Sequence, residues 1–347
     1  MRCLTLANAF AKQGCDSVFC MRAWDGNLYH KVEAAGIAVQ QFSGDSAEEA
    51  RIQKDFSQGS QGFSDWLVDA RHTYQLCKEN AVTMVVVDHY LLDAKWESYL
   101  RERGIAVFVI DDLANRPHDC DYLLDQTLLR PKDDYVPYVP SDCTLFLGAD
   151  YCLLRPDFLH HRTDSLARRA NSPLRSILIS MGGGDPNQLS YHALEALVEA
   201  VLPHEIAVSV IIGPLADTKD KLDKLAERAP FQVHILHNVS HMAQIMATHD
   251  IIINSGGTTN WERLALGLPS IVTKVASNQS DIISVLVSQD LAFEVAHDSV
   301  TRFQKDVVEV ITLLQNQPDR FAEACQKSAQ IVDAHGTERV MKAVLDR

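Results

Sequence analysis

Residues 250–279 read DIIINSGGTTNWERLALGLPSIVTKVASNQ, and the order of residue types in this stretch predicts a strand, a tight turn and a helix. Ile251–Asn254 is short and β-branched, as expected of a strand buried within a parallel sheet. Gly256 and Gly257 bring no side-chain bulk into the turn, and the hydroxyl of Thr258 or of the next threonine is suited to cap the helix. The stretch therefore predicts one repeating unit of an α/β sheet.

The same stretch predicts a site for an anion. The backbone N–H groups that open a helix have no partner within it, and the helix dipole places positive potential on them. Gly267 ends the predicted helix and Pro269 prevents its resumption, so a second strand is expected at 270–275. Glu262 lies one turn into the helix, where its carboxylate is placed to accept hydrogen bonds from a diol such as a ribose. A nucleotide sugar fits this arrangement.

A second glycine turn follows a predicted strand at 176–181. Gly182–Gly184 leads into Asp185, a residue type that caps helices. Two glycine turns that both open helices favour phosphate binding over a purely structural role. Neither turn matches GxxxxGK[ST] or GxGxxG, so neither a Mg-ATP loop of that kind nor a nicotinamide site is supported. Asn278 and Gln279 come after the last strand of the opening stretch, on the rim of the same predicted crevice.

Composition limits the classes of function. The 347 residues carry a formal net charge of −14, which argues against a nucleic-acid or acidic-membrane partner, and 46% of them are hydrophobic, enough for a sizeable core. The eight cysteines occur without a CxxC pair, as is typical of reduced core thiols. No apolar run approaches the roughly 20 residues that span a bilayer, and no signal-peptide segment is evident. We expect a cytoplasmic protein without metal or cofactor, of undetermined oligomeric state.

Strand and helix patterns alternate along the chain. The clearest strand of the first half is at 82–87, and a clean run of strands and helices resumes at 176 after a proline-bearing, polar and basic segment. We predict two doubly wound α/β domains facing a central cleft. Their expected bounds are residues 1–156 and 175–347, with a linker at 157–174.

Asp88, His89 and Tyr90 follow the strand at 82–87, where α/β proteins place functional side chains. His89 is a candidate base near neutral pH, and Tyr90 is a candidate donor to a leaving-group or ring oxygen. The structural alternative is a histidine bonded to a neighbouring carboxylate and a tyrosine packed over the turn.

Asp111 and Asp112 end another predicted strand, at 106–110. Paired carboxylates suit acid–base or metal chemistry, but Asp112 equally suits the cap of the next turn. His118 and Cys120 resemble half of a metal site without a second half at a suitable spacing. We therefore predict no metal site.

Taken together, these motifs resemble a known family. The run from Ser255 through Glu262, followed by 265–269, is similar to the nucleotide-binding half of GT-B glycosyltransferases, especially the N-acetylglucosaminyltransferase that makes lipid II. Further motifs narrow the resemblance to the UDP-sugar hydrolases of pseudaminic acid biosynthesis: residues 1–7 (MRCLTLA), 88–90 (DHY), 110–116 (IDDLANR), 147–156, 179–185 (ISMGGGD), 278–279 (NQ) and 336–339 (GTER).

The resemblance implies a reaction and roles for the site residues. It implies hydrolysis of UDP-2,4-diacetamido-2,4,6-trideoxy-β-L-altropyranose at the anomeric carbon, with inversion and without a metal. The turn Gly182–Gly184 and the turn Ser255–Thr258 would hold the diphosphate, Glu262 the ribose, and Asn278 and Gln279 the sugar or the water.

The sequence departs from this family at its start. Members normally precede the MRCLTLA helix with a strand and a glycine-rich loop that bears a histidine base. We therefore expect the first strand and the glycine loop to be missing, and the chain as given to have weak activity or none, unless His89 substitutes as base. The alternatives are a GT-B UDP-sugar glycosyltransferase and an inactive UDP-sugar binder.

Overall fold

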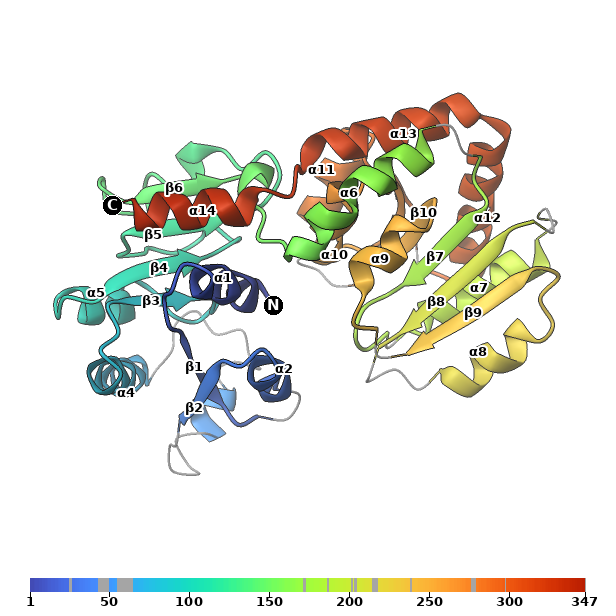
Figure 1. Ribbon diagram of the computed structural model, residues 1–347. Helices are drawn as coiled ribbons and strands as arrows, with labels where there is room; N and C mark the ends of the chain where they lie inside the picture. Colours follow the sequence, from blue (N-terminus) through green and yellow to red (C-terminus); the bar gives the residue numbers. More distant parts are fainter. Residues whose placement is uncertain are drawn as a thin grey trace. The chain divides into compact units, whose positions relative to one another are not determined.

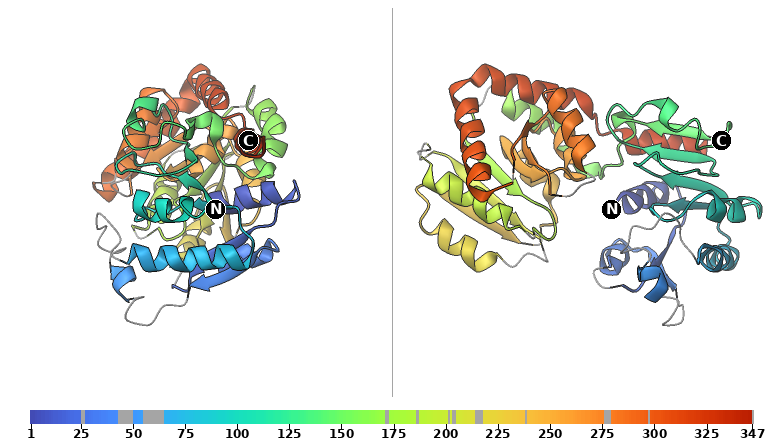
Figure 2. Two further views of the ribbon diagram at one scale, coloured as in Figure 1. Left: turned by 90° about the vertical axis from the view of Figure 1, so that its left-hand side faces the viewer. Right: turned by 180° about the vertical axis from the view of Figure 1, so that it is seen from behind.

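The computed structural model describes residues 1–24, 27–42, 50–54, 65–170, 173–185, 187–200, 202, 205–213, 218–237, 239–275, 279–296 and 298–346. The chain divides into two compact units. Unit 1 is Met1–Leu153 with Gly336–Arg347, and unit 2 is Leu154–His335. Figures 1 and 2 show strands with helices packed around them in each unit. In the part of the chain that the structure describes, no helix combines the length and apolarity needed to cross a membrane.

The described residues of unit 1 form two parallel sheets. β1 (Val18–Arg22) pairs with β2 (Ala38–Phe42), and a second sheet has the order β3-β4-β5-β6. The strands of that second sheet are Met84–Val87, Ala106–Ile110, Tyr122–Asp125 and Thr144–Leu147. The helices are α1 (Arg2–Ala11), α2 (Tyr29–Ala34), α4 (Trp66–Glu79), α5 (Ala94–Arg101) and α14 (Gly336–Leu345), with single turns η1 (Lys132–Asp134) and η2 (Ala149–Tyr151).

The central strands of unit 1 are buried on both faces, which explains their continuous apolar sequences. Because side chains alternate along a strand, Val107 and Val109 face α4 and α5, whereas Phe108 and Ile110 face α1 and α14. Helix α14, red in Figure 1, comes from the far end of the chain and contributes Val340 to this core. Unit 1 therefore depends on residues from both ends of the sequence.

A cavity of about 1250 Å³ lies between the two sheets of unit 1. Its wall includes Phe19 and Met21 of β1 and Val85 and Val87 of β3. Among the described residues β1 and β3 do not pair with each other, so two strand edges border the cavity.

Unit 2 contains one parallel sheet with the order β12-β11-β10-β7-β8-β9. Its strands are β7 (Ser176–Ser180), β8 (Ala207–Ile212), β9 (Gln232–His237), β10 (Ile251–Ser255), β11 (Ser270–Thr273) and β12 (Phe293–Glu294). Its helices are α6 (Pro156–Arg169), α7 (Leu189–Glu199), α8 (Lys219–Ala226), α9 (Met242–Ala247), α10 (Thr259–Ala265), α11 (Ser280–Ser288), α12 (Val300–Asn316) and α13 (Pro318–Ile331). Helices α7, α8 and α12 pack on the face of the sheet that carries Ile177, Ile179, Ile251 and Ile253.

Three features differ from the sequence expectation. The segment expected as a linker, 157–174, is largely helix α6, whose Arg169 is buried and donates to the carbonyl oxygens of Met246, His249 and Leu266. Arg169 thus binds the carboxyl ends of α9 and α10 instead of solvent. Residues from 336 onward pack in unit 1, although 175–347 was expected as one domain. The two-residue strand β12 was not expected, because it is too short for a periodic pattern.

We predict that Gly213→Ala destabilises unit 2. An added Cβ would lie 2.3 Å from the carbonyl oxygen of Gly183, a contact that backbone must move to relieve. We expect the free energy of unfolding to fall by about 1–3 kcal/mol, as in other overpacked sites. Urea unfolding measures this change. Gly183→Ala is the matched control, because its Cβ would meet no atom within 4 Å, and equal stability of the two variants would contradict the close approach.

Candidate functional site

Strand order places the candidate site of unit 2. From β7 the chain continues to β8 and β9 on one side, and then crosses to β10 and β11 on the other side. In open α/β sheets a ligand crevice forms outside the carboxyl ends of the strands where the order reverses in this way. The register pairs Asn254 with Ser180, so the glycine turns after β7 and β10 emerge side by side at that edge.

The turn after β10 is packed on one side and open on the other. A Cβ on Gly256 would lie 2.8 Å from Ile283 Cδ1 and 2.9 Å from Gln279 Cβ, so glycine is needed where the turn contacts α11. A Cβ on Gly257 would meet nothing closer than Ser255 Oγ at 4.0 Å. At the start of α10 the N–H groups of Asn260 and Trp261 donate to the carbonyls of Gly257 and Thr258, so the amides that precede them, of Thr258 and Thr259, are the ones placed to meet a ligand. This turn therefore leaves room for an anion beside its amides.

Buried polar side chains hold this turn in place. Asn260 donates to the carbonyl of Gly257 at 2.9 Å, and its Oδ1 accepts from Arg263 Nε at 2.9 Å. Arg263 is fully buried and also donates to the carbonyl of Leu291 at 2.9 Å. The turn is thus attached to the loop before β12 by a chain of hydrogen bonds, which limits its reorganisation on ligand binding.

The turn after β7 presents glycines but a helix N-terminus that is already occupied. Gly182 adopts φ +92°, and side chains added at Gly182 or Gly183 would meet open space. The Asp185 carboxylate accepts from the N–H groups of Leu189 at 2.8 Å and Ser190 at 2.9 Å. Because Asp185 satisfies the first amides of α7, a phosphate at this turn has only the glycine backbone, including Gly184, to bind.

Glu262 is the acidic residue of the site. It follows the turn on α10, and burial raises the pKa of its carboxyl while Arg155 opposes the shift. The Arg155 Nη2 to Glu262 Oε1 distance is 3.9 Å. Arg155 was missed in the sequence, where it appeared only within a family motif. Gln279 is the residue before α11, and its Oε1 accepts from Val275 N at 2.9 Å, so this end of its amide is already bonded. Asn278 lies outside the described residues.

A second polar cluster lies at the carboxyl edge of the larger sheet of unit 1. Arg2 donates to Asp88 at 2.7 Å and to Asp112 at 3.1 Å, and Tyr90 Oη lies 3.3 Å from the same Asp112 oxygen. Burial raises the pKa of the Asp112 carboxyl, and Arg2 reverses this only in part. Burial raises the pKa of Tyr90, and the negative charge of Asp112 adds to this effect, so that the pKa is about 12. Tyr90 therefore keeps its proton at neutral pH. No local pattern of residues indicated the role of Arg2.

His89 is held differently from the expected base. Its Nδ1 accepts a hydrogen bond from the N–H of Leu91 at 3.2 Å, which places the proton of the neutral ring on Nε2. Burial lowers the pKa of His89, so the neutral ring is favoured. The side chain also lines the cavity between the two sheets. In this geometry His89 offers its Nε2–H as a hydrogen-bond donor. It can act as a base only if the hydrogen bond from Leu91 N to its Nδ1 breaks.

Two buried carboxylates support the loops that carry this cluster. Asp111 accepts from Arg116 at 2.6 Å, and Asp125 accepts from Arg130 at 2.7 Å. The hydroxyl of Tyr135 lies 2.8 Å from Asp111 and 2.9 Å from Asp125. The two aspartates that were expected to act as a pair therefore have different environments. Asp111 is fully buried in a structural network, whereas the side chain of Asp112 is 29% exposed.

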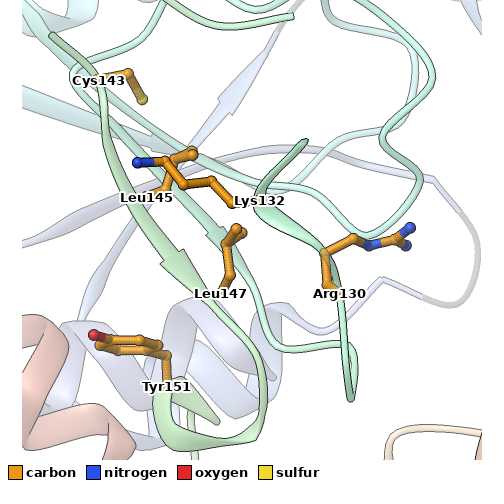
Figure 3. Close-up of a pocket in the computed structure, with 6 residues that line it drawn as sticks. All are labelled: Arg130, Lys132, Cys143, Leu145, Leu147 and Tyr151. Carbon is orange, nitrogen blue, oxygen red and sulfur yellow. The ribbon is translucent and has the colours of Figure 1, made fainter. Parts of the chain in front are cut away.

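A smaller cavity of about 330 Å³ lies beside the edge strand β6 (Figure 3). The figure labels its lining residues, Arg130, Lys132, Cys143, Leu145, Leu147 and Tyr151. Arg130 directs its guanidinium away from the other labelled side chains and is bonded to Asp125 and Asp134. We assign this cavity no part in the candidate site. Within the described ranges, no group of three or more His, Cys, Asp and Glu side chains is arranged to hold a metal ion.

Comparisons with known proteins agree with this arrangement. Residues 177–340 match the model of the glycosyltransferase family 28 C-terminal domain. The spore coat polysaccharide biosynthesis protein SpsG of Bacillus subtilis is 22% identical over 209 residues, 60% of this chain and 60% of the relative. The UDP-2,4-diacetamido-2,4,6-trideoxy-beta-L-altropyranose hydrolase of Campylobacter jejuni is 25% identical over 187 residues, 53% of this chain and 64% of the relative. The chain thus spans less than two thirds of each relative's length.

Solved structures establish the fold. MurG of Acinetobacter baumannii aligns with 100% of this chain and 95% of its own, with a TM-score of 0.69 and 17% identity. The protein therefore has the GT-B fold, with two Rossmann-like α/β units, and the predicted fold class is confirmed.

We predict that unit 1 loses stability as the pH falls. Burial would raise the pKa of Asp111, but Arg116 and the N–H of Ala114 together hold it below its ordinary value. A carboxyl group whose pKa is lower in the folded than in the unfolded chain stabilises the fold when the pH is above its unfolded pKa, about 3.9. This stabilisation is lost as the pH falls below that value. The urea midpoint measures the loss by fluorescence in a Trp261→Phe background, where the remaining tryptophans belong to unit 1.

Asp111→Asn is the comparison for this prediction. The variant removes the titrating group, so we expect lower stability at neutral pH but a smaller further loss in acid. An acid dependence equal to that of the parent chain would show that other carboxylates control it.

Proposed function

We propose that this protein is a UDP-sugar hydrolase. Unit 2 binds the UDP, and the polar cluster of unit 1 supplies the groups that cleave the bond between the anomeric carbon and the diphosphate. The observation that carries the proposal is the pair of glycine turns at the point where the strand order of unit 2 reverses. The Campylobacter relative, named as a hydrolase of a UDP-diacetamido sugar, supports the choice of substrate.

The binding chemistry follows from the two turns. The amides that open α10 and the backbone of Gly182–Gly184 donate to the diphosphate, which lets a chain of net charge −14 hold an anion locally. The carboxylate of Glu262 accepts from the ribose hydroxyls. Gln279 and Asn278, at and before the start of α11, contact the sugar end.

The bond cleavage needs a water, a base and stabilisation of the leaving group. Water attacks the anomeric carbon from the face opposite the diphosphate, the C–O bond breaks, and its electron pair leaves with UDP. The products are UDP and 2,4-diacetamido-2,4,6-trideoxy-L-altrose with inverted anomeric configuration. Asp112 accepts the proton of the water, because its raised pKa makes it a stronger base than an ordinary aspartate. Tyr90 donates a hydrogen bond to the sugar or the water, and His89 contributes a donor.

Glu262→Gln tests the nucleotide site. We expect UDP affinity to fall about tenfold, because a charge-assisted hydrogen bond to the ribose becomes a weaker neutral one. The preference for UDP over dUDP should fall with it, since the lost contact is to the ribose hydroxyls. Calorimetric titration measures both ligands. Glu309→Gln, on the exposed face of α12, is the control, and a Glu262→Gln variant that binds UDP as well as this control does would remove Glu262 from the site.

Asp112→Asn tests the catalytic assignment. We expect kcat for UDP release from the UDP-diacetamido sugar to fall about 10²–10⁴-fold, as when a general base is lost, with UDP affinity unchanged. Asp142→Asn, at an exposed position of unit 1, is the control. Unchanged kcat would move the role of base to another residue. Proton NMR of the freshly released sugar tests inversion.

A GT-B glycosyltransferase is the second candidate. The match of residues 177–340 to the family 28 C-terminal domain favours it, because that description names glycosyl transfer. The two reactions differ in whether UDP is released without an acceptor. Release in water alone supports the hydrolase, release only with an added acceptor supports the transferase, and UDP binding without release from any sugar leaves a non-catalytic binder.

A further inference from the structure

Leu129 combines backbone strain with solvent exposure. Its φ is +59°, in the left-handed region that side chains other than glycine rarely adopt, and the residue is 62% exposed. The other non-glycine residues with positive φ in the described part of the chain are alanines, aspartates and a glutamine. A strained leucine that gains little from burial is not explained by packing.

The neighbours of Leu129 impose this conformation. Arg130 donates to Asp125 at 2.7 Å, to Asp134 at 3.1 Å and to the carbonyl of Asp112 at 2.9 Å. Thr127 N donates to the other oxygen of Asp125 at 2.7 Å. The loop is therefore fixed on both sides of Leu129, and such strain persists where the surrounding structure over-determines it, often at functional sites.

The same bonds tie the loop of Leu129 to the backbone of Asp112, the residue proposed as base. Because Arg130 binds the carbonyl of Asp112, the loop of Leu129 lies beside residue 112. Leu113, the next residue, is 39% exposed, and Tyr90, which bonds to the Asp112 carboxylate, is 45% exposed. Tyr90, Leu113 and Leu129 are three exposed large side chains on loops that are tied to Asp112 by a hydrogen bond to its carboxylate, by the chain itself and by a hydrogen bond to its carbonyl, respectively. We call them the Asp112 rim.

We propose that the Asp112 rim contacts the methyl groups of a deoxy, N-acetylated sugar, and that Leu129 is a specificity-determining residue. The identity of the ligand rests on the proposed function. A 6-deoxy sugar with two acetamido groups presents three methyl groups next to its hydroxyls, and this matches apolar side chains around a hydrogen-bond acceptor. A sugar with a hydroxymethyl at C6 would place a polar group against the rim.

Leu129→Gly separates binding from folding. Glycine adopts positive φ without strain, so we expect the thermal midpoint to stay level or rise. Ala81→Gly is the matched control, since it relieves a positive φ of 51° at the opposite edge of the sheet. Saturation-transfer NMR with free 2,4-diacetamido-2,4,6-trideoxy-altrose then reports contact with each methyl group. We expect transfer to the C6 methyl in the parent chain and in Ala81→Gly, and its loss in Leu129→Gly.

Turnover adds a second readout. We expect Leu129→Gly to lower kcat/KM for the UDP-diacetamido sugar by about 10-fold or more, the scale of one apolar contact, and to lower its preference over UDP-N-acetylglucosamine. If saturation transfer to the C6 methyl is absent in the parent chain, or is unchanged in Leu129→Gly, the rim proposal is overturned whether or not UDP is released. Saturation transfer that depends on Leu129, without UDP release, supports the rim and refutes the hydrolase. A clear drop in the thermal midpoint of Leu129→Gly would show a packing role and also overturn the proposal.

Discussion

The parallel pairing of β7 with β10 is the contact on which the candidate site depends. It joins Ile179 to Ile253 and Ser180 to Asn254, and these residues are buried within the sheet. Each buried isoleucine contributes roughly 1.5–3 kcal/mol, so the register is strongly specified. Since a glycine turn follows each strand directly, this one register aligns two sets of backbone amides. A site made of main-chain groups thereby inherits the rigidity of the core.

Unit 1 uses a different device for the same purpose. β4 and β5 lead into aspartates, Asp111 and Asp125, that are buried and paired, so the loops beyond these two strands start from fixed points. Asp111 and Asp125 do not face solvent, whereas Asp112 does. Two adjacent residues thus supply a structural carboxylate and one that is available for chemistry, because consecutive side chains at a strand end point in opposite directions. The strain at Leu129 depends on the same anchors.

Local patterns made much of this architecture predictable. The strands at 106–110, 176–181 and 251–254 were expected from apolar runs, and the glycine turns from residue type alone. Long-range pairing was not accessible in the same way. Arg2 meets Asp88 across 86 positions, and Arg155, the residue before α6, meets Glu262 of α10. The return of α14 to unit 1 depends on where Val340 is buried, which no local period reveals.

The cavity between the two sheets of unit 1 has a consequence for the dynamics of the protein. Because β1 and β3 share no ladder bonds in the described structure, the β1–β2 layer is held to the rest of the unit by side chains and loops alone. Such a layer opens at a lower free energy than a sheet joined by hydrogen bonds. Cys77 lines the cavity and is buried, and burial raises the pKa of its thiol to about 11. Its alkylation rate would therefore follow the opening of this layer rather than the unfolding of the whole unit.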